Sequence, residues 1–164
     1  MFGNTDAEAS LPGGSLRNDD TILDSDKVAY LKAAHVLNAA LDSAPEAQYV
    51  EDDLPGHKAW AGRVSAALTR QADLLDAHQW PGGSDEPVAD LVKDLRAAQK
   101  EWAKASEASD ADEFYAHYDK GAELIDPQKS VTARKALGLA ATPPSYDEDG
   151  GSGDSAGGDT GMEV

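Results

Sequence analysis

The stretch SDEPVADLVKDLRAAQKEW, residues 84–102, decides the fold class. Its apolar side chains recur at intervals of three and four residues: Val88, Leu91, Val92, Leu95, Ala98 and Trp102. This spacing places them on one face of a helix with about 3.6 residues per turn, and charged residues fill most of the other positions. The sequence therefore predicts an amphipathic helix here, with Ser84 as its N-cap.

Similar patterns predict two helices before this stretch. The first would start near Ser25, end before Pro45 and bury one apolar stripe: Val28, Leu31, Ala34, Leu37 and Leu41. The second would have Pro55 in its first turn, where a missing N–H costs nothing. Its inward face would be Trp60, Val64, Leu68 and Leu75, with Ala61, Ala67 and Ala72 between them. The turn at residues 80–83, Trp-Pro-Gly-Gly, ends it.

The region after residue 108 leaves one alternative open. Asp110 and Glu113 have the spacing of a capping box that opens a fourth helix. Its inward residues would be Phe114, His117, Tyr118 and Leu124. At Asp126-Pro127 this helix either kinks or gives way to a new helix capped by Asp126. The second alternative is favoured because Gly138 then falls where a C-terminal capping glycine belongs.

These elements together predict an all-α protein. No window alternates in the way that strands do, and 29 alanines suit closely packed helices better than strands. Short connections favour an antiparallel up-and-down bundle of four to five helices over residues 24–142. Residues 1–23 are expected to form a flexible arm. Residues 143–164 hold six acids, six glycines and no base, and are expected to be a disordered acidic tail.

Composition excludes several classes of function. The chain has 164 residues, and its 31 acidic against 14 basic side chains give a net charge of -17. Such a charge disfavours direct contact with nucleic acid. The absence of cysteine removes disulfides, thiolate zinc sites and cysteine nucleophiles. No run approaches the roughly 20 apolar residues that span a bilayer, so no membrane span is expected.

No motif assigns a catalytic, cofactor-binding or metal-ligating residue, and no cofactor is expected. The four histidines are His35, His57, His78 and His117. Glu113 and His117 are one residue too far apart for the Glu-x-x-His pairs of di-iron bundles. The acidic residues 147–154 lack the glycine position and the following helix of an EF-hand. Phosphate-binding loops, nucleophile elbows and Ser-x-x-Lys motifs are also missing from the sequence.

The aromatic residues and one acidic connector offer candidate contact residues. Trp60 and Trp102 lie on predicted core faces and are expected to be packing anchors. Trp80 stands at a turn, where it either covers the end of the bundle or contacts a partner. The predicted partner contact consists of this tryptophan and the connector before the second helix: Trp80, Tyr49, Glu51, Asp52 and Asp53.

The layout from Leu31 to Pro144 resembles a loosely defined group of small, uncharacterised helical proteins of actinobacteria, many of them predicted to be secreted or lipid-anchored. The resemblance is carried by the Trp80-Pro81 turn, the alanine-rich helices around it, and the run Ala133–Leu139 before Pro143-Pro144. It implies no activity and no site residue. The sequence shows no export signal and no acceptor cysteine, so the protein is expected in the cytoplasm or a virion, or outside the cytoplasm if a signal has been removed.

Three functions remain as hypotheses. The first is a non-enzymatic interaction or structural module with a protein partner, a subunit or accessory of a larger assembly such as a virion or surface complex. The second is an acidic decoy that occupies the nucleic-acid-binding site of a basic partner. The third is a metal-binding or enzymatic bundle that uses His117, Glu113 and inward acids. The sequence leaves the oligomeric state open.

Overall fold

The computed structural model describes residues 21–141, which form five α-helices and one 3-10 turn. They are α1 (Asp24–Asp42), η2 (Val50–Asp52), α2 (Leu54–Ala77), α3 (Gly82–Ser106), α4 (Ala111–Leu124) and α5 (Pro127–Ala136). These residues contain no strand, so the all-α helical bundle is confirmed. The predicted arm, except for residues 21–23, and the predicted acidic tail lie outside the described residues.

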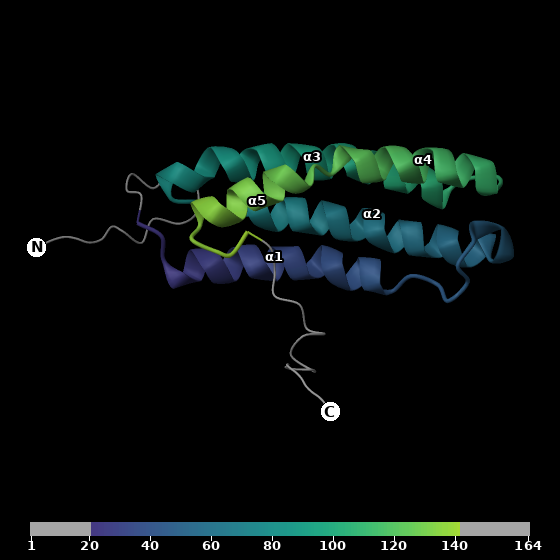
Figure 1. The fold of residues 1–164 in the computed structure, drawn as a ribbon, viewed down its shortest axis with the longest axis horizontal. Helices are drawn as coiled ribbons and strands as arrows, with labels where there is room; N and C mark the ends of the chain where they lie inside the picture. Colours follow the sequence, from purple (N-terminus) through teal and green to yellow (C-terminus); the bar gives the residue numbers. More distant parts are fainter. Residues whose placement is uncertain (1–20, 142–164) are drawn as a thin grey trace, which may run out of the picture.

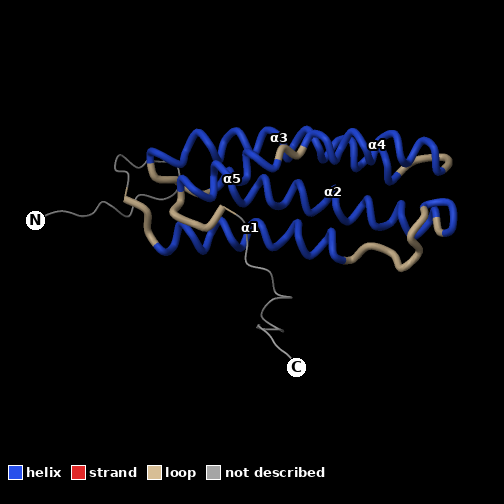
Figure 2. Tube along the Cα trace, in the orientation of Figure 1, coloured by secondary structure: helices blue, strands red, loops and turns tan. Residues whose placement is uncertain are grey.

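The three longest helices, α1, α2 and α3, lie side by side, while α4 and α5 follow one another along α3 (Figure 1). Helix α2 lies between α1 and α3 and packs against both. Near one end of the bundle, Trp60 Nε1 on α2 donates a hydrogen bond to the Ala40 carbonyl on α1 over 3.0 Å. Near the other end, His78 Nε2 lies 2.8 Å from Asp26 Oδ1. The connection from α1 to α2 and the connection from α2 to α3 lie at opposite ends of the bundle (Figure 2).

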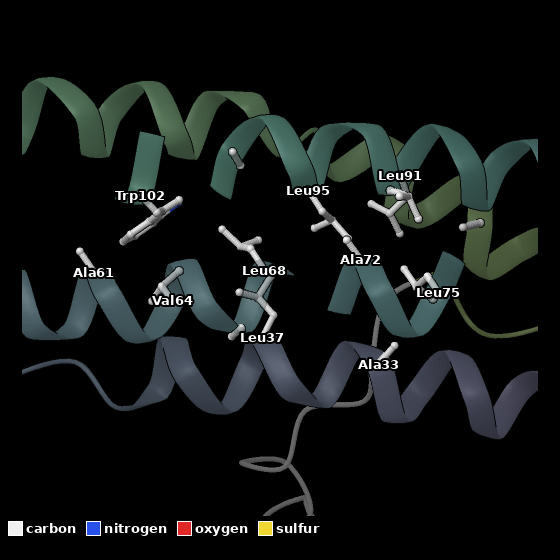
Figure 3. Packing of buried hydrophobic residues seen from close by; sticks show 14 of the residues in the cluster. Ala33, Leu37, Ala61, Val64, Leu68, Ala72, Leu75, Leu91, Leu95 and Trp102 are labelled. Carbon is white, nitrogen blue, oxygen red and sulfur yellow. The ribbon is translucent and has the colours of Figure 1, made fainter. Parts of the chain in front are cut away.

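The core is built mainly from α2 and α3. Every residue predicted to face inward on these two helices is buried. Leucines and alanines from both helices interdigitate, with Ala33 and Leu37 of α1 packed on the opposite side of α2 (Figure 3). Alanines with essentially no exposed surface, such as Ala61 and Ala72, allow these helices to approach closely.

The predicted inward stripe of α1 is wrong at three of its five residues, while Leu37 is buried as predicted. Val28, Leu31 and Leu41 are exposed, and the buried apolar residues are Tyr30, Ala33 and Leu37. The predicted stripe advanced by three residues in each of its first three steps, and each such step falls about 60° short of a full turn. Its members therefore wind half-way around the helix. The observed set at i, i+3 and i+7 stays on one face.

Two local predictions are also wrong. Ser84 is not the N-cap of α3, because Gly82 and Gly83 are already helical and Pro81 is the cap residue. Ser84 is buried in the first turn, where its Oγ donates to the Pro81 carbonyl over 2.9 Å. Leu124 is exposed, although the next residue, Ile125, packs against the core.

The ends of α4 and α5 agree with the sequence pattern. Asp110 caps α4 by accepting from the Glu113 N–H, and the Glu113 carboxylate accepts from the Ser109 N–H. Asp126 caps α5, with Pro127 as its first residue, so a new helix begins there.

The predicted C-terminal capping glycine of α5 is confirmed. Gly138 has a φ of 73°, a left-handed conformation that favours glycine. Its N–H donates to the Lys135 carbonyl, and the Leu139 N–H donates to the Arg134 carbonyl over 2.8 Å. These two bonds form a Schellman motif, which satisfies carbonyls at the end of the helix.

Among residues 21–141, no helix has the combination of length and apolar character that a membrane crossing requires.

Candidate functional site

The most distinctive surface lies on the connection between α1 and α2. Tyr49 is 57% exposed, the highest fraction among the exposed large hydrophobic side chains of the described residues. Glu51 and Asp52 are exposed beside it in the sequence, on the turn η2. We call Tyr49, Glu51 and Asp52 the acidic corner. Three of the five predicted contact residues are thus available at one place on the surface.

The backbone of the acidic corner is anchored. The side chain of Val50 is buried, and the Val50 N–H donates to the hydroxyl of Tyr115 on α4 over 3.2 Å. The Asp52 N–H and the Asp53 N–H donate to the Tyr49 and Val50 carbonyls, each over 3.1 Å. The hydroxyl of Tyr115 also lies 3.5 Å from Glu51 Oε1. The turn therefore presents its exposed side chains from a fixed position.

Asp53, the third acidic residue of the predicted contact, has a structural role. It is the N-cap of α2, and its Oδ1 accepts from the Gly56 N–H over 2.9 Å. Its carbonyl accepts from the His57 N–H and lies 2.9 Å from His57 Nδ1. This carboxylate therefore stabilises the start of α2, and its place in a partner contact stays a prediction.

An aromatic cluster lies beneath the acidic corner. It consists of His57 and Trp60 from α2, Trp102 from α3, and Phe114, Tyr115 and Tyr118 from α4. The ring centres of Trp60 and Trp102 are 5.2 Å apart, and their planes are nearly perpendicular. This edge-to-face arrangement stabilises aromatic pairs beyond the area that they bury. Both tryptophans are packing anchors, as predicted.

A pocket of about 250 Å³ opens between this cluster and the loop that leads to the acidic corner. Its walls include Pro45 and Gln48 from the loop, and His57 and Tyr118 from the helices. Tyr115, whose hydroxyl holds the turn, was not predicted from the sequence. Its position between Phe114 and Tyr118 shows that this turn of α4 is rich in aromatic residues. The sequence does not show that Tyr115 supports Val50, which is 65 positions away.

Trp80 is buried, so the prediction that it contacts a partner is corrected. Only 5% of its surface is exposed, and its Nε1 donates to the Leu75 carbonyl over 2.7 Å. Its ring meets Tyr30 edge to face and lies 4.3 Å from the ring of His78, centre to centre. These contacts agree with the alternative prediction, in which Trp80 covers one end of the bundle.

The histidines are spread over different surroundings. His35 is exposed, whereas His57 is buried in the aromatic cluster. His78 pairs with the buried Asp26, and His117 Nδ1 lies 2.9 Å from Glu101 Oε1. Residues 21–141 contain no group of three or more histidine and acidic side chains that could hold a metal ion. The metal hypothesis combined Glu113 with His117. In the structure, the carboxylate beside His117 is that of Glu101.

The Glu101–His117 contact has an electrostatic consequence. The hydrogen bond with His117 lowers the pKa of Glu101, and the nearby Lys104 adds to this effect, while burial opposes it. The pair joins α3 to α4 close to the aromatic cluster. Its geometry and partial burial indicate a structural contact between helices.

No family model matches the chain, and neither a curated protein nor a solved structure is significantly similar to it.

Proposed function

We propose that this protein is a non-enzymatic interaction module and that the acidic corner is its contact surface for a partner protein. The observation that carries the proposal is an exposed tyrosine, Tyr49, on a turn that Val50 and Tyr115 hold in place. Tyrosine is among the residues that contribute most to binding energy in protein interfaces. A turn that is already ordered loses little further entropy when it binds.

Charge indicates the chemistry of the partner. Glu51 and Asp52 follow the buried Val50 with two exposed carboxylates, and the whole chain carries a charge of -17. Electrostatic complementarity then favours a partner whose contact surface is basic. In this proposal the protein is a subunit or accessory of a larger assembly, such as a virion or a surface complex.

The test is capture of partners from the native source with the tagged full-length protein, at low and at high salt, followed by mass spectrometry. The corner variant carries Tyr49→Ala, Glu51→Gln and Asp52→Asn. A matched control carries Asp85→Asn and Glu86→Gln, which remove the same two charges from exposed positions near the start of α3. Circular dichroism checks that both variants keep their helix content.

We expect the wild type and the control to retain one stoichiometric partner that the corner variant loses. Equal retention by the corner variant would contradict the acidic corner as the contact surface. Absence of any partner under both salt conditions would contradict the interaction module itself. A basic nucleic-acid-binding partner that the wild type loses at high salt would favour the acidic decoy instead.

A further inference from the structure

A second hollow lies on a different side of the bundle, where α1, α2, α3 and α5 meet. It has a volume of about 350 Å³, within the range of sites that bind small molecules. Its apolar wall is formed by Leu37, Leu41, Leu91, Leu95, Ile125 and Val131. We call this hollow the α5 crevice. At its edge, the Tyr30 hydroxyl lies 3.2 Å from Ser130 Oγ, which joins α1 to α5.

Arg134 supplies a positive charge to this apolar crevice. It lines the crevice and is only 6% exposed. Its Nε donates to the Ala140 carbonyl over 2.6 Å, but it forms no ion pair with any carboxylate within residues 21–141. The two terminal nitrogens of the guanidinium have no hydrogen-bond partner among these residues and can donate to an anion, in a chain that has more than twice as many acids as bases.

Gln71 supplies a second unsatisfied group. It also lines the α5 crevice, is 5% exposed, and its Oε1 is buried without a hydrogen-bond partner. Buried polar atoms in folded proteins are rarely left unpaired, because their lost contacts with water are then not replaced. The acceptor Gln71 Oε1 is therefore open to an O–H or N–H donor that enters the crevice.

We propose that the α5 crevice binds an apolar carboxylic acid whose chain carries a hydroxyl group, of which a β-hydroxy fatty acid is the simplest example. The carboxylate would accept hydrogen bonds from the free nitrogens of the Arg134 guanidinium. The hydroxyl would donate to Gln71 Oε1, and the apolar chain would cover the leucines of the wall. This site shares no residue with the acidic corner and does not depend on the proposed function.

The test is calorimetric titration of the full-length protein with β-hydroxydecanoate, decanoate and decanol, each below the concentration at which it forms micelles. We expect one β-hydroxydecanoate to bind per chain. Decanoate, which lacks the donor for Gln71, is expected to bind several-fold more weakly. Decanol lacks the carboxylate and is expected to bind about tenfold or more weakly than decanoate.

Three variants locate the binding. Arg134→Gln removes the charge, and we expect it to weaken β-hydroxydecanoate binding by about tenfold or more. Ala34→Phe fills the crevice from the half-buried Ala34 of α1 and leaves Arg134 intact, so it tests the site even if Arg134→Gln disturbs the end of α5. Gln71→Leu is expected to remove the preference for the hydroxyl. The matched control is Arg96→Gln, since Arg96 pairs with Asp73 outside the crevice.

Several results would overturn the proposal. No binding of β-hydroxydecanoate or decanoate would remove the site. Binding of several molecules per chain that Ala34→Phe leaves unchanged would show adsorption to the surface instead. Equal affinities of the wild type for β-hydroxydecanoate and decanoate would contradict the role of Gln71.

Discussion

Glu101 on α3 and His117 on α4 show how one pair of side chains links stability to pH. Their contact atoms are 2.9 Å apart, and the hydrogen bond lowers the pKa of Glu101 in the folded protein. A carboxylate whose pKa is lowered by folding stabilises the fold above its ordinary pKa. That contribution is lost as the pH falls through the lowered value.

We therefore expect Glu101→Gln to reduce the free energy of unfolding at pH 7 by about 1 kcal/mol. Urea denaturation at pH values from about 7 to 3 measures the difference between variant and wild type, which should shrink toward the acidic end. Glu46→Gln is the control, because Glu46 is exposed in the loop after α1. A difference at pH 3 that is as large as the difference at pH 7 would contradict the pairing.

The contacts that an individual side chain makes were the hardest feature to predict from the sequence. Trp80 stands next to a Pro-Gly-Gly turn, a sequence typical of an exposed loop. Its burial depends on Tyr30, which is 50 residues away, and on a carbonyl of the preceding helix. Asp53 is similar, because its role as a helix cap depends on where α2 begins. Local composition carries no signal for contacts of this kind.

For helix α1 as a whole, the sequence predicted that the helix forms but not which of its faces is buried. Its existence followed from the apolar residues between Ser25 and Pro45. Its buried face did not, because Val28, Leu31 and Leu37 are all apolar and only one of them meets the core. An outer helix with apolar residues on several sides has more than one plausible inward face. Helix α3 has charged residues on its outer side, so its orientation was predicted correctly.

The packing of α4 on α3 depends on the small size of Gly121. A Cβ at this position would lie 2.9 Å from Cδ1 and Nε1 of Trp102. Because the rigid ring of Trp102 is held among other rings, we expect Gly121→Ala to lower the free energy of unfolding by about 1–3 kcal/mol.

Gly62 provides the matched control for this prediction. It lies within α2, and a Cβ there would be 3.8 Å from the Ser106 Cβ, an ordinary contact. Gly62→Ala should therefore raise the stability, by up to about 1 kcal/mol, through helix propensity alone. Both variants are compared with the wild type by chemical denaturation. Equal effects of the two substitutions would show that α4 does not approach α3 as described.

At the scale of the whole molecule, the sequence predicted more of the fold than of the site. Periodic apolar residues and capping signals were sufficient for the helices, since both act within a few residues. The acidic corner was found in part: Tyr49, Glu51 and Asp52 are exposed, but the anchoring by Tyr115 required the packing of α4. The α5 crevice was missed entirely, because Gln71 and Arg134 are brought together only by the packing of four helices.

In the proposed function, this bundle meets a partner protein through the acidic corner. The most direct measurement is amide hydrogen exchange of the protein, alone and in complex with the partner that it retains, resolved along the chain by mass spectrometry. We predict that exchange slows on binding in the peptides that cover residues 49–52. Protection of α1, α3 or α5 with no change at residues 49–52 would contradict the claim and place the interface elsewhere.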